Sequence, residues 1–77
     1  LVFCMTKRKE IVEELIRENF KGIIIHEVQI RYMKEKLKEV TDNDSTMAIM
    51  RKISESESMQ EQHIRHSEIL KQMLKEK

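Results

Sequence analysis

Residues 12–40 of the chain read VEELIRENFKGIIIHEVQIRYMKEKLKEV, and the predicted fold follows from their pattern. Apolar side chains recur in this stretch at alternating spacings of four and three residues, the repeat of a helix that packs along another helix. The pattern predicts a first helix over residues 6–40. The nine positions of the repeat, called the first seam, are Val12, Ile16, Asn19, Ile23, His26, Ile30, Met33, Leu37 and Val40.

The segment around Gly22 allows a second interpretation. Three isoleucines follow Gly22, and because β-branched residues favour strands, a helix end after Phe20 and a strand over residues 23–32 are the alternative. The spacing of the first seam is the same before and after Gly22, whereas a break would normally shift it. The sequence therefore favours one continuous helix, in which the glycine costs about 1 kcal/mol relative to alanine. We expect another helix to pass close to it.

The clearest loop is residues 41–45, which read TDNDS. Each of these side chains can hydrogen-bond to the backbone in turns and helix caps. Asp44 or Ser45 is predicted to cap a second helix over residues 46–76. Two serines in the middle of that helix stand three residues before a glutamate, a capping-box spacing that leaves open a break near residues 54–58. The absence of glycine and proline there favours continuity.

Two long helices joined by a short loop predict an all-α fold, an antiparallel helical hairpin. The 77 residues include no proline, one glycine and 38% charged side chains, the composition of long helices. Residues 1–5, LVFCM, are interpreted as a tail or a remnant, ahead of one helical domain over residues 6–77 that Thr6 caps. Folding at the loop is expected to bring apolar side chains together at three levels: Met33 with Ile53, Ile23 with Ile64, and Val12 with Leu74.

The first helix carries more apolar surface than one partner helix can cover. Around residues 20–28 it is apolar on nearly every side, and such a helix needs burial all round. A chain of this size, without a disulfide or a zinc cluster, also needs a partner for stability. We therefore expect the hairpin to dimerise into a four-helix bundle. The predicted assembly residues are Val12, Ile16, Asn19, Phe20, Ile23, Ile24, His26, Ile30, Met33, Leu37, Ile53, Ile64, Leu70 and Leu74.

Asn19 and His26 occupy seam positions that are usually apolar. A buried asparagine can fix helix register and oligomer state, and a buried histidine can respond to pH near neutrality. These roles predict a polar layer that sets register or senses pH. The alternative is that both are partly solvated side chains at an imperfect seam.

Few residues have the spacing that catalysis or metal binding requires. His63 and His66 share a helix face, but the surrounding residues match neither the zinc-protease nor the di-iron motif. Cys4 is the single cysteine, and no neighbouring base is predicted to activate it. One glycine cannot form a phosphate-binding loop. We therefore predict no catalytic residue, no cofactor and no metal, and the sequence argues against an enzyme.

The charge pattern indicates which partners the chain can have. The net charge is +1 with both signs interspersed, which gives no strong field toward nucleic acid or an anionic membrane. Aromatic residues that could stack on bases are scarce, and no stretch is apolar enough to span a membrane. A free cysteine indicates a reducing compartment, the cytoplasm.

These observations predict a small helical module that binds itself and another protein. Regulatory adaptors and anti-repressors are of this size and kind. One alternative is a structural coiled-coil segment of a longer protein. The other is a hairpin dimer that binds RNA.

Overall fold

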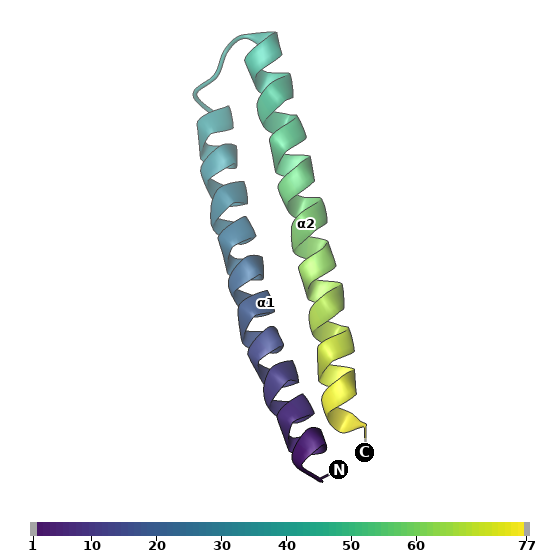
Figure 1. Cartoon of the computed structure of the whole chain (residues 1–77). Helices are drawn as coiled ribbons and strands as arrows, with labels where there is room; N and C mark the ends of the chain where they lie inside the picture. The colour runs from purple at the N-terminus through teal and green to yellow at the C-terminus, as the bar shows by residue number, and fades with distance from the viewer. Residues whose placement is uncertain (1, 77) are drawn as a thin grey trace.

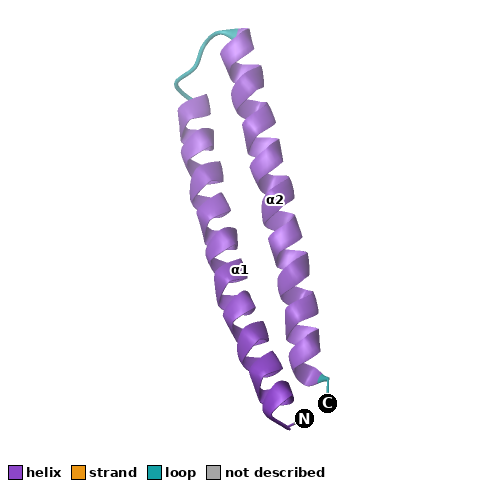
Figure 2. Cartoon of the chain, in the orientation of Figure 1, coloured by secondary structure: helices purple, strands orange, loops and turns teal. Residues whose placement is uncertain are grey.

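A computed structural model describes the backbone of residues 2–76 and the side chains of residues 7–76. It contains two helices, α1 (Val2–Leu37) and α2 (Asn43–Lys75), and no strand within the described residues. The helices run antiparallel and lie side by side, with both termini at the end opposite the loop (Figure 1). Outside the short connection and the extreme C-terminus, the described chain is helical (Figure 2). The predicted all-α hairpin is confirmed.

The first helix ends three residues earlier than predicted. α1 stops at Leu37 instead of residue 40. Lys38 and Glu39 then donate backbone hydrogen bonds to the carbonyls three residues before them, at 3.2 and 3.0 Å, a tightening common at helix ends. The loop is therefore residues 38–42, not 41–45.

The second helix also starts earlier, because Asp42 caps it in place of Asp44 or Ser45. The Asp42 carboxylate accepts the backbone N–H of Ser45 at 2.9 Å, with Asp42 itself in an extended conformation. Hydrogen bonds from the Ser45 hydroxyl and N–H hold the pKa of the Asp42 carboxyl below its ordinary value. This choice of cap leaves Asp44 in the first turn, where its negative charge meets the positive end of the helix dipole.

Both helices are uninterrupted where the sequence left a break open. α1 passes through Gly22, and α2 passes through residues 54–58. α1 begins at Val2, so Thr6 lies inside the helix and is not its cap. The predicted tail is thus helical over residues 2–5, and Leu1 lies outside the described residues. Neither α1 nor α2 has a stretch that is both long and apolar enough to cross a bilayer.

Packing between the helices forms a narrow seam instead of a globular core. The hairpin measures 61 × 14 × 13 Å with a radius of gyration of 17.8 Å, whereas a compact domain of this length has about 11–12 Å. All nine positions of the first seam are buried or partly buried, so α1 meets α2 along the predicted line. Among the described side chains only Val12, Ile30 and Ile53 are buried, with 3%, 7% and 8% of their surface exposed.

The face of α2 that meets α1 includes the predicted Ile53 and Leu70 but not the predicted Ile64. Ile23 does not lie opposite Ile64. The Ile23 carbonyl accepts a hydrogen bond from Gln60, which is four residues before Ile64. Ile64 is exposed instead. Because the loop is centred earlier, the α2 residue opposite Ile23 is displaced in the same direction. The α2 positions at the seam, here called the second seam, are Ile49, Ile53, Ser56, Gln60, His63, Ser67 and Leu70.

Candidate functional site

A polar layer crosses the middle of the hairpin where the two seams meet. His63 Nδ1 and Asn19 Oδ1 are 2.7 Å apart, and the Asn19 side-chain amide donates to the His63 backbone carbonyl. Because an amide oxygen only accepts, the imidazole carries its proton on Nδ1 in this arrangement. One turn further along the hairpin, Gln60 Nε2 donates to the Ile23 carbonyl at 3.1 Å. Each helix thus donates a side-chain amide to a carbonyl of the other, which fixes their alignment.

Gly22 provides the space that the His63 ring occupies. A Cβ atom at position 22 would lie 2.8 Å from Cε1, 2.9 Å from Nε2 and 3.1 Å from Nδ1 of His63. Protein interiors are packed as densely as crystals of small molecules, so contacts this short form only if a neighbouring group moves. The imidazole therefore packs directly on the α1 backbone, which confirms the predicted close approach of another helix at the glycine.

His26 faces His63 within the same layer. The two ring centroids are 5.6 Å apart and the rings are tilted by 32°. The Nδ1 atom of His26 is buried without a hydrogen-bond partner among the described residues, and such an atom costs roughly 1–3 kcal/mol. The polar layer consists of Asn19, His26, Gln60 and His63. Asn19 and His26 lie in the seam as predicted, while pH sensing by this layer stays a prediction.

The position of Gln60 and His63 in the second seam can be read from their spacing in the sequence, although they are not apolar. Ile53 and Leu70 bracket them, and steps of three and four residues connect the two ends. The intervening positions are Ser56, Gln60, His63 and Ser67. The same spacing that identifies the first seam therefore also identifies the polar members of the second.

Two shallow grooves run beside the seam. The lower groove, nearer the termini, has a volume of about 380 Å³, and the upper groove, nearer the loop, about 410 Å³. The lower groove is lined by Leu15, Glu18, Asn19, His63, His66, Ile69 and Leu70. The upper groove is lined by Gln29, Tyr32, Met33, Lys36, Ile49, Lys52, Glu55 and Ser56.

The two grooves are built from equivalent positions of the helices. Each α1 residue of the lower groove has a counterpart fourteen residues later in the upper groove, and the α2 linings are related in the reverse direction. Fourteen residues are two heptads, and residues at that spacing share one face of a paired helix. Both grooves therefore open on one side of the hairpin, here called the groove face. The α1 pairs are Leu15 with Gln29, Glu18 with Tyr32, and Asn19 with Met33.

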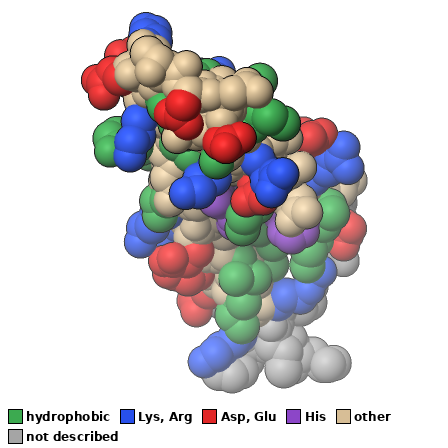
Figure 3. Space-filling view, turned by 90° about the horizontal axis from the view of Figure 1, so that it is seen from above, with side chains coloured by type: hydrophobic (Ala, Val, Ile, Leu, Met, Phe, Trp, Pro, Cys, Tyr) green, Lys and Arg blue, Asp and Glu red, His purple; other side chains and the backbone are tan. Residues whose placement is uncertain are grey.

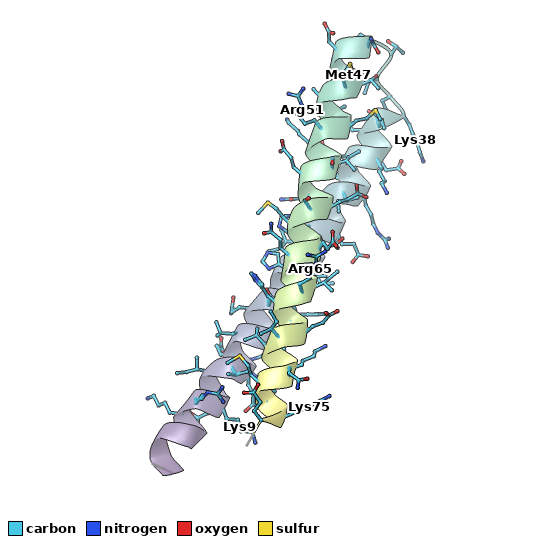
Figure 4. All side chains as sticks on the ribbon, turned by 90° about the vertical axis from the view of Figure 1, so that its right-hand side faces the viewer. Lys9, Lys38, Met47, Arg51, Arg65 and Lys75 are labelled. Atoms are coloured by element: carbon cyan, nitrogen blue, oxygen red, sulfur yellow. The ribbon has the colours of Figure 1, made fainter. Side chains whose placement is uncertain are left out.

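Apolar side chains reach solvent on both sides of the hairpin. On the groove face, Ile25 and Met59 lie midway between the two grooves and are 56% and 50% exposed. On the opposite face, Phe20, Ile24 and Ile64 are exposed as well. Seen from the loop end, green hydrophobic side chains reach the surface between charged ones (Figure 3). Along residues 7–76, side chains project outward from both helices (Figure 4).

Four predicted assembly residues therefore lie outside the seam of the hairpin. These exposed residues are Phe20, Ile24, Ile64 and Leu74. The other predicted assembly residues lie between α1 and α2, in the first or second seam.

Ion pairs within each helix gather away from the groove face. Four of them use residues that line neither groove. These pairs are Arg17–Glu14 at 2.7 Å, Arg31–Glu27 at 3.1 Å, Lys38–Glu35 at 3.2 Å and Arg65–Glu61 at 2.8 Å. The hydrogen bond from Arg17, together with its charge, lowers the pKa of Glu14. A fifth pair, Lys21–Glu18 at 3.2 Å, reaches the rim of the lower groove.

The arrangement offers packing surfaces and a polar layer. Within the described residues, no three or more histidine, cysteine, aspartate or glutamate side chains are grouped to hold a metal ion. No protein-family model, curated protein or solved structure matches the chain. The seam, the grooves and the exposed apolar side chains are therefore the features from which a function can be argued.

Proposed function

We propose that the chain is a helical protein–protein interaction module that self-associates by packing one side of the hairpin against a second copy, forming a four-helix bundle. The observation that carries this proposal is the ratio of exposed to buried apolar side chains. Thirteen large hydrophobic side chains of the described residues are exposed, and three are buried. Exposed patches of this extent are typical of interaction sites.

The surface area supports the same proposal. The hairpin exposes 6561 Å², whereas a folded monomer of 9.3 kDa exposes about 5,000 Å². The excess is thus about 1,600 Å² per chain. Homodimers that exist only as dimers bury roughly 2,000–5,000 Å² in total over both chains, so pairing two hairpins can remove this excess.

Sedimentation equilibrium over a wide concentration range tests self-association directly. We expect a mass of twice the 9.3 kDa chain, with helical circular dichroism that weakens as the dimer dissociates. A monomer that keeps its full helicity at every concentration would overturn the proposal. A monomer with weak helicity would indicate that a different protein, or the remainder of a longer coiled coil, covers the apolar surfaces.

We further propose that the bundle acts on another protein in the cytoplasm, as a regulatory adaptor does. The support is the cluster of Phe20, Ile24 and Ile64, which lies on the side away from the groove face. A small protein with two apolar sides can close one of them with its own copy and present the other. Loss of a captured partner in a Phe20→Glu variant that remains dimeric would support this division.

A further inference from the structure

We infer that the groove face is the surface on which the second copy sits, with a two-fold axis that crosses the hairpin at Ile25 and Met59. The inference deepens the proposed self-association and rests on it. In this arrangement each copy is turned end over end relative to the other, so that α1 packs antiparallel on α1. The lower groove of one hairpin then covers the upper groove of the other.

The distribution of charge selects the groove face over the opposite one. Charged residues are depleted in the centre of protein interfaces, and aromatic and methionine side chains are enriched there. The four ion pairs that avoid the grooves use eight residues elsewhere on the hairpin. The groove face instead carries Tyr32, exposed to 64%, with Ile25 and Met59 in its centre. Leu15 and Ile69 continue the apolar strip along the lower groove.

The charges that do line the grooves select the antiparallel arrangement. Glu18 is the only acidic or basic side chain that lines the lower groove, apart from its histidines. The upper groove has Lys36, Lys52 and one glutamate, Glu55. Pairing like grooves would bring four lysines of two copies together, whereas pairing unlike grooves brings Glu18 toward lysines of the other copy. Complementary charges of this kind decide which orientation of two surfaces is favoured.

The spacing along α1 gives the contacts in this arrangement. Positions equally distant from Ile25 face each other across the axis, and Glu18 and Tyr32 are each seven residues from it. Glu18 of one copy therefore lies beside Tyr32 of the other, with Lys36 one turn further. The exposed ion pair of Glu18 with Lys21 is of the kind that contributes little, so it leaves the carboxylate free to exchange partners.

Two matched substitutions on α1 test which face is used. Ile25→Glu and Phe20→Glu each put a carboxylate at a half-exposed isoleucine or phenylalanine, 56% and 60% exposed. We expect Ile25→Glu to weaken dimerisation on the order of 100-fold, as loss of a central interface residue does. Phe20→Glu should leave the dimer unchanged. The reverse result overturns the groove-face inference but leaves self-association intact, while a monomeric parent chain refutes both.

Disulfide trapping tests the axis in a chain whose single cysteine, Cys4, is replaced by serine. Helices 8–10 Å apart place facing Cα atoms roughly 3.4–5.4 Å apart, which overlaps the disulfide range. An Ile25→Cys chain should oxidise rapidly to a covalent dimer that keeps its helicity, and a Phe20→Cys chain should not. If the copies instead pair with like grooves together, Ile25→Cys stays unlinked. An equimolar mixture of Ile25→Cys and Met59→Cys chains then forms the disulfide, which overturns the axis.

Discussion

Replacing Gly22 by alanine is expected to destabilise the hairpin when residue 63 is histidine and to stabilise it when residue 63 is alanine. In a helix, alanine is favoured over glycine by about 1 kcal/mol. In the native hairpin the new Cβ would lie 2.8 Å from Cε1 of His63. The ring can turn away, but it then loses the hydrogen bond between its Nδ1 and Asn19 Oδ1, which are 2.7 Å apart.

The magnitude follows from these two opposing terms. Leaving a partly buried donor and acceptor without their hydrogen bond costs roughly 1–3 kcal/mol. Gly22→Ala is therefore expected to destabilise the native hairpin by about 1 kcal/mol. In a His63→Ala background neither the ring nor its hydrogen bond is present, so the same substitution should stabilise by about 1 kcal/mol. The coupling between the two positions is then about 2 kcal/mol.

Thermal unfolding followed by circular dichroism measures this coupling. All four chains are compared at one protein concentration, because association makes the midpoint depend on concentration. For a chain of this size 1 kcal/mol shifts the midpoint by about 4–8 °C. Gly22→Ala should lower the midpoint of the parent and raise that of His63→Ala. Equal stabilisation in both backgrounds would show that the imidazole does not pack on the glycine, and the geometry of the polar layer would be refuted.

Three further substitutions probe the core, the register and the cap. Ile30→Ala should cost about 2–5 kcal/mol in urea unfolding because Ile30 is 7% exposed, whereas Val28→Ala, at 61% exposed, should cost less than about 0.5 kcal/mol; equal costs would contradict the assignment of the seam. Gln60→Leu removes the hydrogen bond to the Ile23 carbonyl and puts an apolar side chain into the seam, so we expect an unchanged or higher melting temperature together with extra oligomeric species in native mass spectrometry; a large loss of stability with one oligomer retained would count against a register role. The pKa of Asp42 is lowered by Ser45, so its contribution to stability is present above the ordinary carboxyl value and is lost as the pH falls through the depressed value. Asp42→Ser keeps a neutral cap and should lack this acid-dependent component in a titration of helicity from pH 5 to pH 2, and parallel titration curves would contradict the cap.

The first seam could be predicted from the sequence because its periodicity is strong and its apolar members outnumber the polar ones. Val12 and Ile30, which belong to the same series of alternating four- and three-residue steps, are the buried members on α1. Asn19 and His26 were recognisable because they interrupt an otherwise apolar series. The continuity of α1 through Gly22 followed from the same register on both sides of it.

The loop could not be placed to the residue because several good caps stand close together. Asp42, Asp44 and Ser45 are all strong N-cap residues by type, and only the geometry shows that Asp42 accepts the Ser45 N–H. Loop position also sets which residues face each other, so the predicted pairing of Ile23 with Ile64 was wrong for the same reason. At the level of Ile23, the α2 residue that contacts its carbonyl is Gln60, one turn before the predicted Ile64.

The second seam has a weaker signal in the sequence than the first because its centre is polar. Gln60 and His63 enter a seam only when each finds a partner on the other helix, here the Ile23 carbonyl and Asn19. These hydrogen bonds depend on how the two helices are aligned, and the alignment cannot be predicted from the periodicity of one helix. The exposed groove face likewise emerges only after both seams are assigned.

The length of the hairpin has a hydrodynamic consequence. At 61 × 14 × 13 Å, the monomer is a rod roughly four times as long as it is wide, so it diffuses more slowly than a sphere of the same mass. Placing a second copy on the groove face adds about 8–10 Å of thickness and little length. Dimerisation therefore makes the particle rounder, and the frictional ratio falls as the mass doubles. An end-to-end association of the same two chains would raise that ratio, so sedimentation velocity alone distinguishes the two forms of growth.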